Sequence, residues 1–201
     1  MNFCQQRFDC AVALFDAANA QDPNLESVNG DTIPKELLYS IRMSEMLLRF
    51  APEASEAICL AVRAQHIQRW KIPRSDFPRT TFGYKQWRSR LYKFHAETAG
   101  QLMRKAGYDE EMIGRVGNSI AKLGIKVNPE TQILEDVADL VFLEHYLTGF
   151  AAQHPEYDEA KWSNILQKTW KKMSPQGRAF ALSKIRLPES LTPLITKSLG
   201  Q

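Results

Sequence analysis

The chain has 201 residues, which fits one ordinary domain with little room for a second. Hydrophobic residues make up 44% of it and charged residues 24%, which matches a globular protein and excludes a disordered, collagen-like or coiled-coil chain. The formal net charge is +3, and no apolar run approaches the roughly 20 residues that cross a bilayer, so we expect no membrane partner.

The first residues and the cysteines bear on the compartment in which the protein works. The N-terminal segment lacks the basic stretch and the long apolar run of a secretory signal. Cys4, Cys10 and Cys59 are an odd number of cysteines without a CxxC pair, which argues against a disulfide framework. We therefore expect a cytoplasmic location, where thiols stay reduced.

Helical periodicity runs through the first third of the chain, and no convincing alternating strand interrupts it. The predicted helices cover residues 5–20, 34–50 and 53–70. Asp31 or Thr32 can cap the second of these helices. The polar stretch 21–31 contains Asn29-Gly30 without alternating runs on either side, so we interpret it as a loop and not as a hairpin.

A basic and aromatic connector follows the third predicted helix, because Pro73 and Pro78 prevent the helix from continuing. Connectors of this length and composition often carry function. Beyond it, longer helices are predicted over residues 83–106, 109–124 and 128–152.

Local signals mark the ends of these later helices. Gly107 fits the C-terminal cap of the fourth helix, and Asp109 and Asn128 can cap the two helices that follow. Two or three shorter helices complete the chain, with breaks at Ser174-Pro175 and at Pro188. The sequence thus predicts an all-α fold, a compact single-domain bundle of seven to nine helices over residues 1–201.

The positive charge is concentrated in residues 63–93. This segment holds nine Lys and Arg residues against one acid, Asp76, a net charge of +8, so the rest of the chain carries −5. One interpretation is that an anionic ligand meets this region. The alternative is a solvated basic surface without a specific partner.

Three polar side chains fall on apolar helical stripes of three separate predicted helices: His66, His95 and Asp136. Burial of an unpartnered polar group costs several kcal/mol, so each of these positions needs a reason. Two imidazoles and one carboxylate can bind a divalent metal ion and leave positions open for water and substrate. The sequence therefore predicts a metal site made of these three residues.

Other interpretations of the three residues stay open. Each histidine can donate to a backbone carbonyl, and Asp136 can pair with an arginine, in which case all three are structural. The spacing matches no compact metal signature. Two histidines and one carboxylate can also hold Fe(II) in an oxygen-using enzyme.

The basic segment supplies candidates for contact with a phosphate. Arginine is suited to bidentate phosphate contacts, so we expect Arg69 and Arg74 to clamp the group. The assisting cations are predicted to be Arg42, Arg88 and Lys93. Trp70 is placed to stack on a base, although an aromatic side chain here can equally cap the bundle, and Arg42 can equally be buried as an ion pair.

Five strings carry a resemblance that covers nearly the whole chain. They are FDAANAQDPN at 15–24, RAQHIQRW at 63–70, IPRS at 72–75, FHAET at 94–98 and LEDV at 134–137. These strings resemble an uncharacterised family, the domain of unknown function 4202. The resemblance supplies almost no biochemistry.

A more distant resemblance is to the HD-domain metal-dependent phosphohydrolases, which are all-α and take their ligands in the order His, His-Asp, then Asp. Residues 61–70 resemble the helix of their His-Asp pair, His95 resembles an additional histidine of some members, and Asp136 resembles their final aspartate. Gln65-His66 replaces the pair, and Tyr39 stands where the first histidine is expected. The resemblance implies either a rearranged metal site or a scaffold that keeps only a binding pocket.

These observations predict a metal-dependent phosphohydrolase acting on a nucleotide or a small phosphorylated metabolite, with Mn, Mg, Fe or Zn as the cofactor. The alternative is a non-catalytic module that binds a nucleotide, RNA or another anion on a degenerate HD-like scaffold. No P-loop, dinucleotide-binding, nucleophile-elbow or HExxH motif offers another chemistry.

Overall fold

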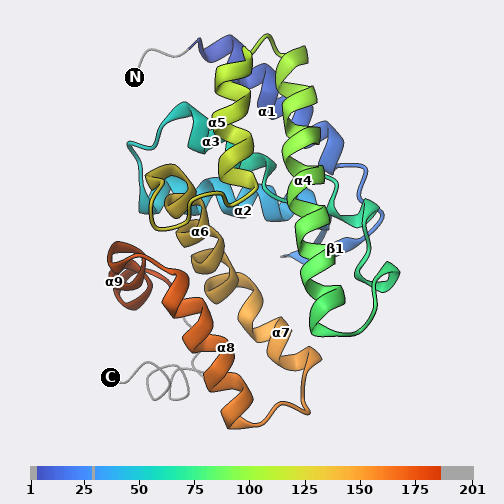
Figure 1. Ribbon diagram of the computed structural model, residues 1–201, viewed down its shortest axis with the longest axis vertical. Helices are drawn as coiled ribbons and strands as arrows, with labels where there is room; N and C mark the ends of the chain where they lie inside the picture. Colours follow the sequence, from blue (N-terminus) through green and yellow to red (C-terminus); the bar gives the residue numbers. More distant parts are fainter. Residues whose placement is uncertain (1–3, 29, 187–201) are drawn as a thin grey trace. The chain divides into compact units, whose positions relative to one another are not determined.

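The computed structural model describes residues 4–28 and 30–186, and the chain divides into two compact units, Met1–Leu134 and Glu135–Gln201 (Figure 1). The prediction of an all-α fold is confirmed, because the described residues contain nine α-helices and one two-stranded sheet. The prediction of a single domain over residues 1–201 stays a prediction. The predicted break at Pro188 lies outside the described residues.

In the first unit the α-helices are α1 (Gln5–Asn19), α2 (Lys35–Phe50), α3 (Glu56–Ala64), α4 (Thr81–Lys105) and α5 (Glu110–Ile120). The short 3-10 helices η1 (Arg69–Lys71) and η2 (Arg74–Asp76) lie between α3 and α4. The unit closes with the first turns of α6 (Pro129–Val141). Helices α4 and α5 pack along each other, and α3 packs against α1, α2 and α5 (Figure 1). Side chains such as Phe15, Met43, Ile58 and Leu91 form a core between these helices.

A small hairpin corrects the interpretation of residues 21–31 as a loop. Strands β1 (Leu25–Val28) and β2 (Asp31–Pro34) pair in an antiparallel register, with Ser27 opposite Thr32. Gly30 lies between them with a φ of +92°, a conformation that glycine adopts without a steric penalty. Gly30 therefore marked a turn, although the flanking residues do not alternate clearly in polarity.

The start of α2 differs from the prediction that Asp31 or Thr32 caps it. Both residues belong to β2, and Asp22 takes the capping role from the loop that follows α1. Its Oδ2 atom accepts a hydrogen bond of 3.0 Å from the Glu36 backbone N–H. This bond satisfies one of the open donors in the first turn and ties α1 to the start of α2.

Helix α3 ends at Ala64, six residues before the predicted end at 70. Gln68 has a left-handed φ of 51°, and its N–H donates to Asn19 Oδ1 at 2.9 Å. A left-handed residue is incompatible with a continuing α-helix, so the chain turns here. The prediction that His66 lies on an apolar stripe of the third helix was therefore wrong, because His66 lies in the turn after α3.

The capping predictions farther along the chain are confirmed. Asp109 Oδ1 accepts from Met112 N at 2.9 Å at the start of α5, and Asn128 Oδ1 accepts from Glu130 N at 2.9 Å at the start of α6. Gly107 has a φ of +87° directly after α4. These signals were legible because each cap acts within a few residues of its own helix.

The second unit contains the rest of α6, a π-helical turn at Phe142–Tyr146, and the helices α7 (Leu147–Gln153), α8 (Glu159–Lys172) and α9 (Pro175–Lys184). Phe150 and Trp162 join α7 to α8 with ring centroids 5.7 Å apart. The predicted break at Ser174-Pro175 is confirmed, because Ser174 caps α9. None of the described helices is long and apolar enough to span a membrane, and Cys4, Cys10 and Cys59 form no disulfide.

Gly83 offers a test of how tightly the connector is packed on α4. A Cβ atom at this position would overlap the carbonyl oxygen of Pro78 and would lie 3.0 Å from its carbonyl carbon. Because that neighbour is backbone, we expect Gly83→Ala to lower the free energy of unfolding by about 1–3 kcal/mol in urea titration. In Gly114→Ala, the matched control, the new Cβ meets no atom within 4 Å, so that helix should gain roughly 0.5–1 kcal/mol. Equal stability of the two variants would contradict the prediction.

Candidate functional site

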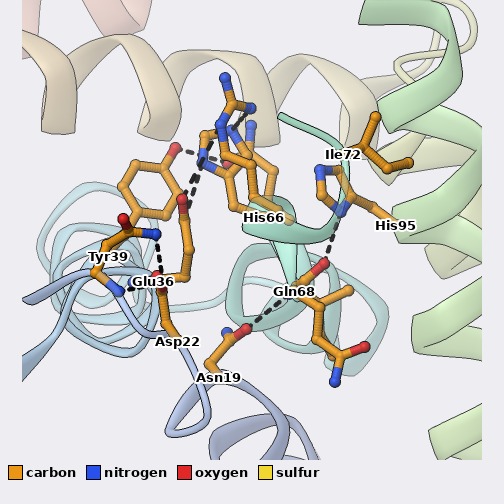
Figure 2. Close-up of polar contacts among 12 residues, drawn as sticks. Asn19, Asp22, Glu36, Tyr39, His66, Gln68, Ile72 and His95 are labelled. Atoms are coloured by element: carbon orange, nitrogen blue, oxygen red, sulfur yellow. Dashed lines mark hydrogen bonds and ion pairs between the residues drawn. The ribbon is translucent and has the colours of Figure 1, made fainter. Parts of the chain in front are cut away.

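Two of the three predicted metal ligands lie together in the first unit. The rings of His66 and His95 have centroids 5.9 Å apart and an interplanar angle of 37°. His66 comes from the turn after α3, and His95 comes from the middle of α4 (Figure 2). We call Glu36, Tyr39, His66, Arg69, Trp87 and His95 the His66 cluster.

His95 is held by the main chain. Its Nδ1 atom is 2.8 Å from the carbonyl oxygen of Ile67, so this nitrogen carries the proton and donates it. The residue is 1% exposed, and its buried Nε2 atom has no hydrogen-bond partner among the described residues. The alternative that the histidine serves a backbone carbonyl is thus correct for one ring nitrogen, while the other keeps a lone pair that nothing in this part of the chain uses.

His66 has a stacking partner on its ring and a charged neighbour at each nitrogen. Its ring stacks on Tyr39 at 4.2 Å, with an interplanar angle of 13°. Its Nε2 atom lies 3.3 Å from Arg69 Nη1, and its Nδ1 atom lies 3.5 Å from Glu36 Oε2. Because a guanidinium can only donate, Nε2 is the acceptor, and the proton is on Nδ1, facing the carboxylate.

Both imidazoles are neutral at physiological pH. Burial lowers the pKa of His95 to about 3, with the nearby Arg69 acting in the same direction, although the bond to Ile67 opposes them. Burial, followed by the positive charges of Arg69, Lys122 and Arg88, holds the pKa of His66 well below its usual value. Neutral imidazole is the form that binds metal ions and accepts protons.

Glu36 is a site residue that the sequence analysis missed. It occupies the first turn of α2, its side chain is 9% exposed, and burial raises its pKa to about 7, against the opposing charge of Arg69. An acid three residues before Tyr39, one helical turn away on the same face, was the available signal. The Asp22 cap fixes its backbone, and Tyr39 donates to Gln65 Oε1 at 3.1 Å beside it.

Arg69 is loosely held. Its shortest polar contact among the described residues is the 3.3 Å approach to His66 Nε2, and Glu36 Oε1 is 4.0 Å away. Its guanidinium carbon lies 4.8 Å from the Trp87 ring, whose Nε1 donates to the Ile72 carbonyl at 2.9 Å. Most of its five N–H donors therefore stay available to a ligand.

The other predicted phosphate ligands have protein partners. Arg74 donates to the carbonyl oxygens of Phe77 and Pro78, both at 2.8 Å, and so braces the connector. Arg42 donates to Glu26 Oε1 at 2.6 Å, an ion pair of the kind considered as its alternative. These contacts brace the fold, and the phosphate-binding role of both residues stays a prediction.

Arg88 and Lys93 lie along α4. Arg88 bonds the hydroxyl groups of Tyr84, at 3.1 Å, and Tyr92. The Lys93 side chain is 68% exposed, faces Glu97 at 3.8 Å and lines an open groove of about 610 Å³ between α4 and α5. Neither histidine lines that groove.

Trp70 and Asp136 belong to different units of the chain. Trp70 belongs to η1 and is half-buried, and Trp87, not Trp70, lies against Arg69. Asp136 belongs to the second unit, where it accepts from Ser174 N at 2.7 Å and from Ser174 Oγ at 2.6 Å. Its carboxylate thus helps to start α9, and its role as a metal ligand stays a prediction.

The His66 cluster can bind a cation, an anion, or both. Within residues 4–28 and 30–186, no three His, Cys, Asp or Glu side chains are grouped as a metal site. The two Nε2 lone pairs are donors of the kind that transition metals prefer, and Arg69 is a donor of the kind that phosphates prefer. Their proximity is the chemical feature of the site.

A model of one protein family matches residues 9–195 of the chain; its description is domain of unknown function (DUF4202). The chain belongs to the DUF4202 family. No curated protein and no solved structure matches it. Membership in DUF4202 names no activity, so the chemistry of the His66 cluster has to carry the functional argument.

Proposed function

We propose that this DUF4202 chain is a metal-dependent phosphohydrolase that acts on a nucleotide or another small phosphorylated metabolite, with the reaction centre at the His66 cluster. The observation that carries the proposal is a pair of neutral imidazoles, 5.9 Å apart, beside an arginine with unused donors. The resemblance to HD-domain phosphohydrolases and the cytoplasmic location belong to the same proposal.

The two imidazoles fit the requirements of metal ligands. A ligating histidine usually donates its other ring N–H to a carboxylate or a backbone carbonyl, which fixes the ring and its tautomer. His66 faces Glu36 and His95 faces Ile67 in this way, which leaves each Nε2 as the ligating atom. The orphaned, buried His95 Nε2 is an atom for which a bound ion would supply a partner.

His66 and His95 would hold the ion. A divalent ion bound here supplies Lewis acidity toward a phosphoryl oxygen. The chain's own part is to keep both rings neutral by burial and to fix their orientation. Tyr39 restricts His66 to one ring plane, and Glu36 holds its Nδ1 proton.

Arg69 is the proposed phosphate ligand. Among the five cations considered, Arg69 combines a position beside the histidines with donors that no carboxylate or carbonyl of the described residues approaches within hydrogen-bond distance. A bidentate contact would orient the phosphate toward the two imidazoles. The Trp87 ring centroid lies 4.8 Å from the guanidinium carbon and offers it a cation–π contact.

Metal binding and turnover test the proposal together. We expect the purified protein to bind one of Mn, Mg, Fe or Zn, and His66→Ala and His95→Ala each to weaken that binding at least tenfold. A panel of phosphate esters should show metal-dependent release of phosphate that both variants lose. His154→Ala, a histidine of the second unit, is the matched control and should leave both readouts unchanged. A protein that binds none of these ions and hydrolyses no ester would contradict the proposal.

One observation favours a second candidate, a non-catalytic module that binds a nucleotide, RNA or another anion. Arg69 lies next to the His66 Nε2 lone pair that a metal ion would need. Basic side chains alone are sufficient to bind a phosphate, without a metal ion and without hydrolysis. This candidate predicts binding that weakens as salt is raised and a ligand that is recovered intact. Arg69→Gln should abolish it, and retention of all anion binding in that variant would contradict both candidates.

A further inference from the structure

The position of Arg69 bears on how a metal ion reaches the histidines. Its guanidinium is 3.3 Å from His66 Nε2, the atom that would ligate the ion. A divalent cation at that lone pair and a guanidinium in its present place would be like charges a few ångströms apart. At an effective dielectric constant near 20 such a repulsion is large compared with thermal energy, so the two cannot be bound there together.

The contacts that retain Arg69 are weak enough to be exchanged. The nearest Glu36 carboxylate oxygen is 4.0 Å from Arg69 Nε, which is beyond hydrogen-bond distance. The guanidinium carbon also lies 4.8 Å from the centroid of the Trp87 ring, a contact that does not use its N–H donors as a carbonyl or carboxylate would. Arg74, in contrast, is tied to two carbonyl oxygens at 2.8 Å and has no such freedom.

We propose that the Arg69 guanidinium blocks the metal position until a phosphate displaces it, and that phosphate and metal ion therefore bind with positive coupling. Without a phosphate, the guanidinium covers His66 Nε2 and opposes a divalent ion. A phosphate accepts hydrogen bonds from the guanidinium, neutralises its charge and draws it away from the imidazole. His66 Nε2 is then accessible to the metal ion. The coupling is reciprocal, because each ligand changes the affinity of the other by the same factor.

This inference rests on the proposed metal site, and it assigns Arg69 a positioning role in addition to phosphate contact. It also predicts an order of binding, in which the anionic substrate binds first and the metal ion second. The chain should hold metal weakly until an anionic substrate arrives, so the free protein would avoid keeping a reactive ion exposed to water.

Co²⁺ titrations followed by visible absorption, with and without inorganic phosphate, test the coupling on the full chain. For the wild type we expect phosphate to tighten Co²⁺ binding at least tenfold. In Arg69→Gln, Co²⁺ should bind at least tenfold more tightly than in the wild type without phosphate, and phosphate should have little further effect. Arg69→Lys keeps the charge without the planar fork, so it should bind Co²⁺ weakly and respond less to phosphate.

Arg90→Gln is the matched control, because it removes an exposed arginine of the same basic segment and should leave both affinities unchanged. Equal Co²⁺ affinity of the wild type and Arg69→Gln would contradict the proposal that Arg69 blocks the metal position, and it would leave the proposed metal site intact. A wild-type protein that binds no Co²⁺ in either condition would overturn the metal site itself. Circular dichroism of each variant checks that the fold is retained.

Discussion

The contribution of His95 to stability should be lost as the pH falls from 6.5 toward 3, and His95→Asn should remove this contribution to the pH dependence. Burial lowers the pKa of His95 to about 3 in the folded chain, whereas an unfolded histidine titrates near 6.5. The unfolded state therefore binds more protons in this range, and the free energy of unfolding rises with pH between the two values. At pH 4 the cost from this one residue is roughly 3 kcal/mol.

Asparagine is chosen because its side-chain amide can replace the Nδ1–H donor toward the Ile67 carbonyl, which lies 2.8 Å from the histidine. Urea unfolding at several pH values measures the difference between variant and wild type. At pH 7 the wild type should have the higher free energy of unfolding, because its side chain packs better. Between pH 7 and pH 4 the difference should change by about 3 kcal/mol in favour of the variant. Two curves that stay parallel from pH 7 to pH 4 would contradict the prediction.

His66 should contribute in the same direction but less. Its pKa is lowered well below the usual value by burial and by three nearby cations. Its side chain is 26% exposed, however, so water can partly solvate the imidazolium. His66→Asn is therefore expected to reduce the pH dependence of the free energy of unfolding below pH 6.5 by a smaller amount than His95→Asn.

The parts of the fold that were legible in the sequence depend on nearby residues. Asp109, Asn128 and Gly107 cap helices within three residues of themselves, and each was predicted correctly. The end of α3 depends on Asn19, which meets the Gln68 backbone from 49 residues earlier in the chain. No local pattern encodes such a contact, so periodicity extended the helix too far.

The candidate site shows the same division. Apolar stripes identified His66 and His95 as polar residues with an unusual environment, and the structure brings their rings within 5.9 Å. His66 nevertheless arrives from a turn, and Glu36 arrives from a helix whose start is set by Asp22. The sequence also could not show which arginine keeps unused donors, because this depends on the carbonyl oxygens that Arg74 contacts in the folded connector.

Glu36→Gln should make the protein more stable at pH 8 and change it little at pH 4.5. Burial raises the pKa of this carboxyl from 4.5 to about 7, with the charges of Asp22 and Glu26 adding to the effect and those of Arg69 and Lys35 opposing it. The folded state therefore holds its proton where the unfolded state has lost it. Stability from this group is complete below pH 4.5 and is lost as the pH rises through about 7.

The size of the gain follows from the shift. A difference of about 2.5 pKa units corresponds to roughly 3 kcal/mol, which the neutral amide of glutamine should recover in large part at pH 8. Glu97→Gln is the matched control, because it neutralises a surface carboxylate that is 59% exposed and should change stability by less than about 1 kcal/mol. Unfolding by urea at pH 4.5, 6 and 8 measures both variants.

Retention of Glu36 in spite of this cost would then have a functional explanation. The carboxylate faces the His66 Nδ1–H at 3.5 Å and Arg69 at 4.0 Å, so it can orient the imidazole and compete for the guanidinium. Glu36→Gln should accordingly weaken metal binding about 10–100-fold while it raises stability at pH 8, as expected for a partner that orients a ligating histidine. A variant that gains stability and keeps full metal affinity would show that Glu36 has no part in the site.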